Sequence, residues 1–151
     1  SFGAEVTVLS SSSRKEADAK RLGAHAFVNT SDRAASKKVR RSFDFILDTV
    51  SAQHDLNFYL DLLKTDGTMV MVGIPPNAEP VEAFSLIGKR KTLAGSMIGG
   101  IRETQEMLDY CAENKIVSDI ELINIRDIEK AYERMAKGDV RYRFVIDMST
   151  L

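Results

Sequence analysis

The chain has 151 residues, of which 44% are hydrophobic and 28% are charged, and its formal net charge is −1. That length suits one domain with a hydrophobic core, and the near balance of 21 basic and 22 acidic residues argues against a nucleic-acid-binding protein. No apolar stretch approaches the roughly 20 residues that span a bilayer. The single cysteine, Cys111, excludes an internal disulfide and is typical of a reducing cytoplasm, where we expect the protein to be located.

Apolar segments with strand character alternate with segments of helical periodicity along the whole chain. The predicted strands occupy residues 4–9, 26–28, 43–48, 68–72, 91–98, 119–123 and 142–147. The predicted helices occupy residues 14–22, 31–41, 54–64, 84–87, 101–114 and 127–136. This alternation is typical of an α/β fold with a parallel sheet that helices cover on both faces.

Two of the predicted helices have apolar residues at helical spacing. Such spacing places the side chains on one face, which we expect to be buried. In helix 54–64 this face carries Leu56, Tyr59, Leu60 and Leu63. In helix 101–114 it carries Ile101, Met107, Leu108 and Cys111.

The fold that we expect is a Rossmann-like doubly wound parallel sheet that lacks its first strand. In such a sheet the first strand leads into a glycine-rich turn, which binds the pyrophosphate of a dinucleotide at a helix N-terminus. The strand at residues 4–9 leads instead into four serines, as the second strand does where it meets the adenosine ribose. Residues 1–151 are thus expected to be a partial dinucleotide-binding domain with unpaired backbone groups beside the absent strand, and therefore to be weakly stable or to pair between chains.

Ligands of an open parallel sheet bind beyond the carboxyl ends of its strands. Small and polar residues follow five of the predicted strands, at positions 10–15, 29–30, 49–51, 73–75 and 96–99. A single polar loop is ordinary in any α/β protein. Five of them together favour a ligand-binding edge.

The serine-rich turn indicates which dinucleotide would bind. An Asp or Glu at the end of this strand would bind both ribose hydroxyls and repel a 2′-phosphate, but here the position is a serine. Hydroxyls and cations that can clamp a phosphate follow at once, so NADP is the predicted cofactor. The residues of this clamp are Ser10, Ser11, Ser12, Arg14 and Lys15. In a compatible alternative, Ser13 caps the helix and the two cations face water.

The sequence offers few metal ligands or catalytic groups. A structural zinc site needs four Cys or His ligands and a catalytic site needs three, whereas His25, His54 and Cys111 lie on different predicted elements. Cys111 is expected to be a small core residue. His54, which precedes a helix, is expected to be a surface or capping residue rather than a base.

Several longer segments carry a family resemblance. Residues 43–50 and 59–67 resemble zinc-dependent medium-chain alcohol dehydrogenases, and residues 93–108 narrow the resemblance to the cinnamyl alcohol dehydrogenase branch. Residues 139–147 are similar to the closing strand of that branch, so the resemblance covers essentially the whole chain. It implies an enzyme in which a hydride passes between an alcohol or aldehyde and NADP(H), while a zinc ion polarises the substrate oxygen.

The resemblance also implies a role for individual cofactor-binding residues. Ser10, Ser11, Ser12 and Lys15 match the site of the adenosine 2′-phosphate, where Arg14 competes with Lys15 for the same role. The remaining matches are Thr49 and Val50 beside the nicotinamide ribose, Val72, Gly73 and Ile74 at the carboxamide, Ser96 and Ile98 in a second wall, and Arg141 at the pyrophosphate.

The family's zinc ligands lie in an N-terminal catalytic domain that precedes the matched part. The chain therefore contains no catalytic or metal-binding residue by this reading, and we expect it to be inactive by itself. If the protein is a homodimer, the resemblance implies that residues 93–98 and the segment before them join the two copies. Two alternatives stay open: a zinc-free quinone oxidoreductase, which shares this domain, and a non-catalytic nucleotide-sensing module.

Overall fold

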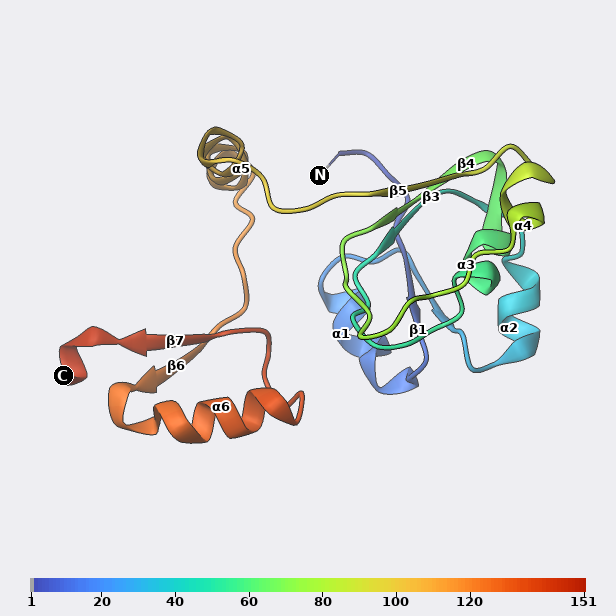
Figure 1. Cartoon of the computed structure of the whole chain (residues 1–151). Helices are drawn as coiled ribbons and strands as arrows, with labels where there is room; N and C mark the ends of the chain where they lie inside the picture. Colours follow the sequence, from blue (N-terminus) through green and yellow to red (C-terminus); the bar gives the residue numbers. More distant parts are fainter. Residues whose placement is uncertain (1) are drawn as a thin grey trace. The chain divides into compact units, whose positions relative to one another are not determined.

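The computed structural model describes residues 2–151 and divides into two compact units, Ser1–Ile98 and Gly99–Leu151. Strands and helices alternate in both units (Figure 1), as the sequence predicts. The first unit contains β1 (Thr7–Ser10), α1 (Glu16–Arg21), β2 (Ala26–Asn29), α2 (Arg33–Lys38), β3 (Phe43–Asp48), α3 (Leu56–Leu62), β4 (Leu63–Met71), α4 (Ala83–Ile87) and β5 (Thr92–Gly95). The second unit contains α5 (Ile101–Glu113), β6 (Glu121–Asn124), α6 (Ile128–Ala136) and β7 (Phe144–Asp147).

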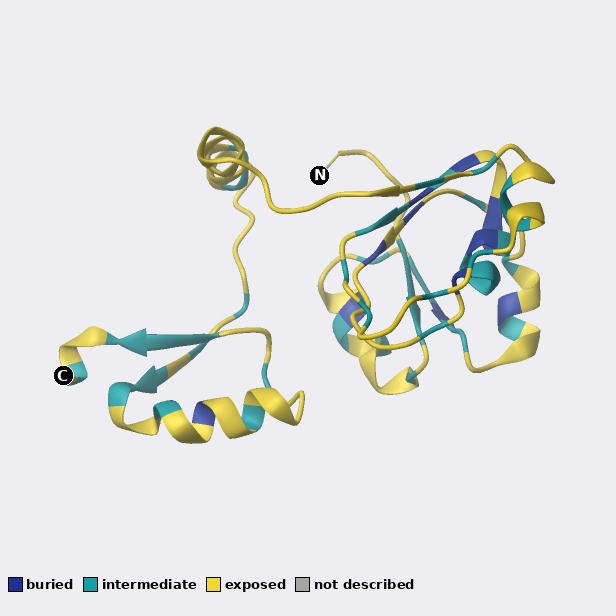
Figure 2. Ribbon diagram, viewed as in Figure 1, coloured by how far each residue is buried: buried dark blue, intermediate teal, exposed yellow. Residues whose placement is uncertain are grey.

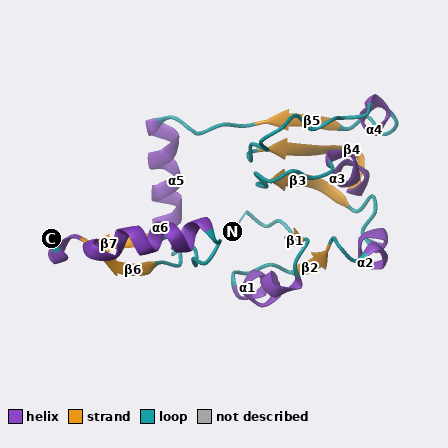
Figure 3. Ribbon diagram, turned by 60° about the horizontal axis from the view of Figure 1, so that its bottom comes forward, coloured by secondary structure: helices purple, strands orange, loops and turns teal. Residues whose placement is uncertain are grey.

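Every strand pair in the structure is parallel. β1 pairs with β2, β4 lies between β3 and β5 (Figure 3), and β6 pairs with β7. Within residues 2–98, β1 and β3 share no hydrogen-bonded ladder. In a doubly wound sheet the strand that precedes β1 would stand at this break, so the topology agrees with the expected fold.

The core of the first unit lies where α3 packs on β3 and β4 (Figure 2). It consists of Ile46, Leu56, Leu60, Leu62, Leu63 and Met69, and the two leucines at 60 and 63 are fully buried. The predicted apolar face of helix 54–64 is therefore confirmed, since Tyr59 also packs against this cluster. Asp55 begins the helix, because its side chain accepts a hydrogen bond from the backbone N–H of Asn57.

The boundary between α3 and β4 differs from the prediction. α3 ends at Leu62 because Leu63 adopts an extended backbone and pairs with Phe43 of β3. The ladder then shifts register before Phe45 pairs with Thr68, and Asp66 adopts a left-handed backbone with φ of 62° in that interval. The Asp-Gly signal thus marks an irregularity within β4 rather than a turn before it.

The second unit is built on β6, β7 and the helix between them. Arg134 of α6 lies over the ring of Phe144 at 4.9 Å from its centroid and pairs with Glu121 at 2.7 Å and Asp139 at 2.9 Å. This arrangement ties the helix to both strands.

The predicted inward face of helix 101–114 is wrong for the unit as the structure describes it. Ile101 is 92% exposed, and Met107 and Leu108 are each about half exposed. No other element in the described part of residues 99–151 makes extensive contact with α5, so no surface covers its apolar residues there.

Candidate functional site

The turn after β1 holds the serines and cations of the predicted phosphate clamp. Arg14 Nε donates a hydrogen bond to Ser12 Oγ over 3.4 Å, so a hydroxyl and a guanidinium lie side by side. Ser10 Oγ accepts a hydrogen bond from the Ser12 N–H over 3.3 Å, and the Ser11 carbonyl accepts one from the Ser31 hydroxyl over 3.0 Å. The backbone of the turn is therefore held from two sides.

Both cations of this turn are exposed to solvent. The alternative in which Ser13 caps the helix is not observed, because Lys15 occupies the N-cap position of α1 and makes no side-chain capping bond. The turn places a positive charge and hydroxyl groups at the end of β1 without a carboxylate among residues 10–15. This is the donor set that a phosphate monoester requires.

The ends of β3 and β4 meet at Asp48, a residue that the sequence analysis did not select. Its backbone carbonyl accepts hydrogen bonds from the N–H groups of Val72 at 2.9 Å and Gly73 at 3.1 Å. Its carboxylate Oδ1 accepts one from the N–H of Val50 at 3.0 Å, and the residue is only 6% exposed. Three predicted cofactor residues are thus brought together by one buried aspartate.

Gly73 is required by this close packing of strand ends. A Cβ atom at this position would lie 2.3 Å from the carbonyl oxygen of Val50 and 2.9 Å from the carbonyl carbon of Thr49. Backbone atoms cannot yield as a flexible side chain can, so no residue with a side chain fits without a shift of the chain.

Other predicted residues of this edge lie beside the end of β4 or are largely exposed. The Ser96 N–H donates a hydrogen bond to the Met71 carbonyl over 3.0 Å, which places Ser96 next to the end of β4. Ile74 is 75% exposed and Ile98 is 93% exposed. Arg141 belongs to the second unit, where its backbone N–H donates to Glu121; its predicted contact with the pyrophosphate stays a prediction.

The expectation for His54 is wrong, because its side chain is largely buried. Its ring Nε2 lies 2.8 Å from Asp48 Oδ2 and its Nδ1 lies 2.8 Å from the carbonyl oxygen of Ala52. The backbone N–H of His54 donates to the Glu79 carboxylate over 2.8 Å. Burial lowers the pKa of His54, but the hydrogen bonds to Ala52 and Asp48 and the negative charges of Asp48 and Glu79 outweigh it, so that the pKa is raised.

Local sequence patterns do not show the whole cluster, because Glu79 lies 25 residues from His54. One signal is present in β3: Asp48 alternates with the buried Ile46 and therefore lies on the inward side of the strand. A carboxylate at an inward strand position needs a partner, and a nearby histidine is a suitable one.

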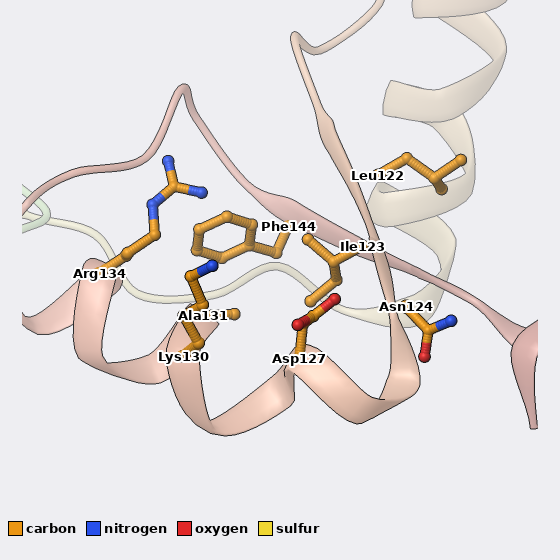
Figure 4. Close-up of a pocket in the computed structure, with 8 residues that line it drawn as sticks. All are labelled: Leu122, Ile123, Asn124, Asp127, Lys130, Ala131, Arg134 and Phe144. Atoms are coloured by element: carbon orange, nitrogen blue, oxygen red, sulfur yellow. The ribbon is translucent and has the colours of Figure 1, made fainter.

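Two cavities lie elsewhere. One of about 180 Å³ lies between α6 and the β6–β7 pair (Figure 4), and Arg134 in its wall is already paired with Glu121 and Asp139. The other, of about 320 Å³, lies beside α2 and α3. Neither is lined by a predicted cofactor residue, so the strand ends remain the candidate site.

Among residues 2–151, no group of three or more His, Cys, Asp or Glu side chains is arranged to hold a metal ion. In the same described residues, no helix combines the length and the apolar character needed to cross a bilayer.

Comparison with known proteins agrees with this geometry. Residues 1–113 match the model of the zinc-binding dehydrogenase family. The chain is 54% identical over 150 residues to NADP-dependent alcohol dehydrogenase C 1 of Mycolicibacterium smegmatis, covering 99% of this chain and 43% of that protein. It is 52% identical over 149 residues to cinnamyl alcohol dehydrogenase 2 of Arabidopsis thaliana, covering 98% of this chain and 40% of that protein.

Among solved structures, a cinnamyl alcohol dehydrogenase of Sorghum bicolor superposes with a TM-score of 0.92 at 42% identity, over 98% of this chain and 42% of that chain. The chain therefore spans about two fifths of the length of the proteins that it matches, and it corresponds to their C-terminal part. By its sequence and its fold, the chain belongs to the zinc-binding dehydrogenase family.

Proposed function

We propose that this chain is the cofactor-binding part of an NADP-dependent alcohol dehydrogenase that interconverts an alcohol and an aldehyde. The observation that carries the proposal is the turn after β1, where Ser12 and Arg14 lie side by side and no acidic residue stands at the strand end. A dinucleotide with a 2′-phosphate suits that turn, because the phosphate can pair with the positive charge of the turn. NAD has no phosphate at this position. The names of the relatives in Mycolicibacterium smegmatis and Arabidopsis thaliana support the same reaction class.

In the proposed complex, each strand end contacts a different part of NADP. The hydroxyls and cations of residues 10–15 bind the 2′-phosphate, and Arg141 contacts the pyrophosphate. Thr49 and Val50 lie beside the nicotinamide ribose, and the backbone of Val72, Gly73 and Ile74 contacts the carboxamide. Ser96 and Ile98 form a second wall. The bound cofactor supplies the hydride, or accepts it, and the chain supplies binding and orientation.

Zinc does not fit the residues of this chain. The described residues contain no group of three or more His, Cys, Asp or Glu side chains that could hold the ion. We therefore propose that a polypeptide of residues 1–151 alone does not catalyse hydride transfer. The family relationship does not favour the quinone oxidoreductase or the nucleotide-sensing module.

The cofactor preference tests this proposal. Dissociation constants of NADPH and NADH are measured by fluorescence titration on the natural protein that carries this sequence and on its Arg14→Ala, Lys15→Ala double variant. Loss of a charged hydrogen bond costs about 1.5–3 kcal/mol, so NADPH should bind about one to two decades more weakly. Binding of NADH should stay nearly unchanged.

A second double variant, Lys37→Ala with Lys38→Ala, is the matched control. It also removes two positive charges, but from exposed positions of α2 that have no proposed role. The proposal predicts that this control keeps the preference for NADPH. An unchanged preference in the Arg14 and Lys15 variant would show that the phosphate clamp is assigned wrongly.

A further inference from the structure

The carboxylate of Asp48 links the predicted nicotinamide turn to a histidine. Its Oδ1 accepts a hydrogen bond from the Val50 N–H over 3.0 Å, while its Oδ2 lies 2.8 Å from His54 Nε2. The two oxygens of the buried Asp48 carboxylate thus connect the backbone of Val50 with the ring of His54. Contacts that fix the His54 ring therefore also fix the Asp48 carboxylate, which binds the Thr49–Val50 turn.

The hydrogen bonds of His54 indicate which charge state the site requires. Nε2 faces a carboxylate oxygen and Nδ1 faces the Ala52 carbonyl oxygen, both at 2.8 Å. Both partners can only accept a hydrogen bond when the carboxylate is ionised. A neutral imidazole has one N–H and can satisfy only one of them, whereas the imidazolium donates to both. The geometry therefore selects the protonated ring.

The groups packed around the ring favour the same state. Asp48 faces it from β3, and the carboxylate of Glu79, in the segment before α4, lies 3.9 Å from Nδ1. The ring of Tyr59, on α3, contacts it edge to face at 5.6 Å between centroids. The neighbouring Asp55 is engaged with the N-terminus of α3. The raised pKa of His54 agrees with this surplus of negative charge.

We propose that His54 is a positioning residue for the cofactor: as an imidazolium it joins the Asp48 carboxylate to the Ala52 carbonyl and so fixes the Thr49–Val50 turn in the conformation that binds the nicotinamide ribose. This inference rests on the proposed function, because it assigns the turn to the cofactor. When His54 loses its proton, one ring nitrogen presents a lone pair to an oxygen and the link breaks. Cofactor binding should therefore be tight while His54 is protonated and should weaken as the pH rises through its pKa.

The experiment measures the dissociation constant of NADPH for the natural protein between about pH 5 and pH 9, a range that includes the ordinary histidine pKa of about 6.5 and extends above it, in the direction in which the pKa of His54 is raised. We expect a loss of affinity of about tenfold across the titration, the value of one charged hydrogen bond. His54→Gln should bind NADPH about tenfold more weakly at the acidic end and should lose the pH dependence. The variant His25→Gln, which replaces the only other histidine at an exposed position, should keep the wild-type profile.

A second measurement keeps the test independent of the folding of the His54 variant. In the wild-type protein, ¹⁵N chemical shifts of the imidazole report whether both ring nitrogens carry protons at the pH where NADPH binds tightly. A neutral His54 ring at that pH, or identical pH profiles in wild type and His54→Gln, would overturn the inference and leave the proposed function intact. If the wild-type protein binds no NADPH at any pH, the proposed function fails, and this inference fails with it.

Discussion

Gly73 is the residue at which the ends of β3 and β4 approach most closely. A Cβ atom added at Gly73 would lie 2.3 Å from the Val50 carbonyl oxygen, whereas one added at Gly95, on the neighbouring β5, would lie 3.8 Å from the Met71 carbonyl oxygen. We predict that Gly73→Ala lowers the free energy of unfolding by about 1–3 kcal/mol, the cost of overpacking a closely packed site. Denaturant unfolding followed by circular dichroism measures the change.

Gly95→Ala is the matched control for this substitution, because both glycines lie at the end of a parallel strand, but an added Cβ at Gly95 would meet backbone only at an ordinary van der Waals distance, whereas one at Gly73 would clash. The control should change the stability by no more than a few tenths of a kcal/mol. Equal losses in the two variants would mean that general strand effects, and not the contact with Val50, determine the result.

At the level of single residues, the sequence selects candidates at strand ends but not the residues that support them. Ser12, Arg14 and Gly73 could be proposed because a strand end and a residue type are both visible locally, and their contacts with a cofactor stay predictions. Asp48 and His54 were not selected, because periodicity does not show that their side chains meet each other, and the hydrogen bond from the His54 backbone to Glu79 forms only when two loops fold against each other. A polar residue in a loop looks the same whether it faces water or another loop.

Among the elements, β4 is the strand that has a partner on both sides. It pairs with β3 and β5 and contributes the buried Met69, whereas within residues 2–98 β1 and β2 pair only with each other and contain few buried residues. Exchange of backbone amides reflects such differences in local stability. We predict that β4 amides exchange most slowly in the first unit and that those of β1 and β2 exchange markedly faster.

Hydrogen–deuterium exchange with mass spectrometry on the chain of residues 1–151 checks this order. Peptides from residues 66–71 and 7–10 provide the comparison, and residues 43–48 of β3, which pair on one side, should be intermediate. Protection of β1 and β2 equal to that of β4 would contradict the prediction, since it would require a further strand partner for β1, from another chain or another segment.

The element pattern itself was predictable from periodicity, with two instructive exceptions. The apolar face of α3 was predicted because Leu56 and Leu60 follow the helical repeat. The start of β4 was missed because Leu63 belongs to that same repeat while its backbone is already extended. The face of α5 was assigned correctly as apolar, but a repeat shows only that a face is apolar and not which surface covers it.

On the scale of the whole chain, the alternation of elements predicted parallel pairing but not where the ladders stop. All four pairings are parallel, yet they form three separate sheets in the described residues. Parallel strands do not pair by local hairpins, so their order depends on crossovers of many residues. The sequence carries that information only through the fold class, which is why the break between β1 and β3 follows from the doubly wound order rather than from any local motif.

The division into two units predicts where a protease cuts first. Residues 96–100 lie outside helices and strands, and Met97 is 82% exposed and Ile98 is 93% exposed. Exposed segments of this kind are cleaved before hydrogen-bonded strands. Thermolysin, which cleaves before large apolar residues, should therefore cut at Ile98 before it cuts within residues 43–71, and mass spectrometry of the early fragments identifies the site.

Replacement of Ile98 by Asp should slow this first cut, and the same replacement at the exposed Val117 should not. Early fragments that end within β3 or β4 would contradict the prediction. They would mean that the protease cuts the buried cluster around Leu60 faster than the exposed segment at residues 96–100.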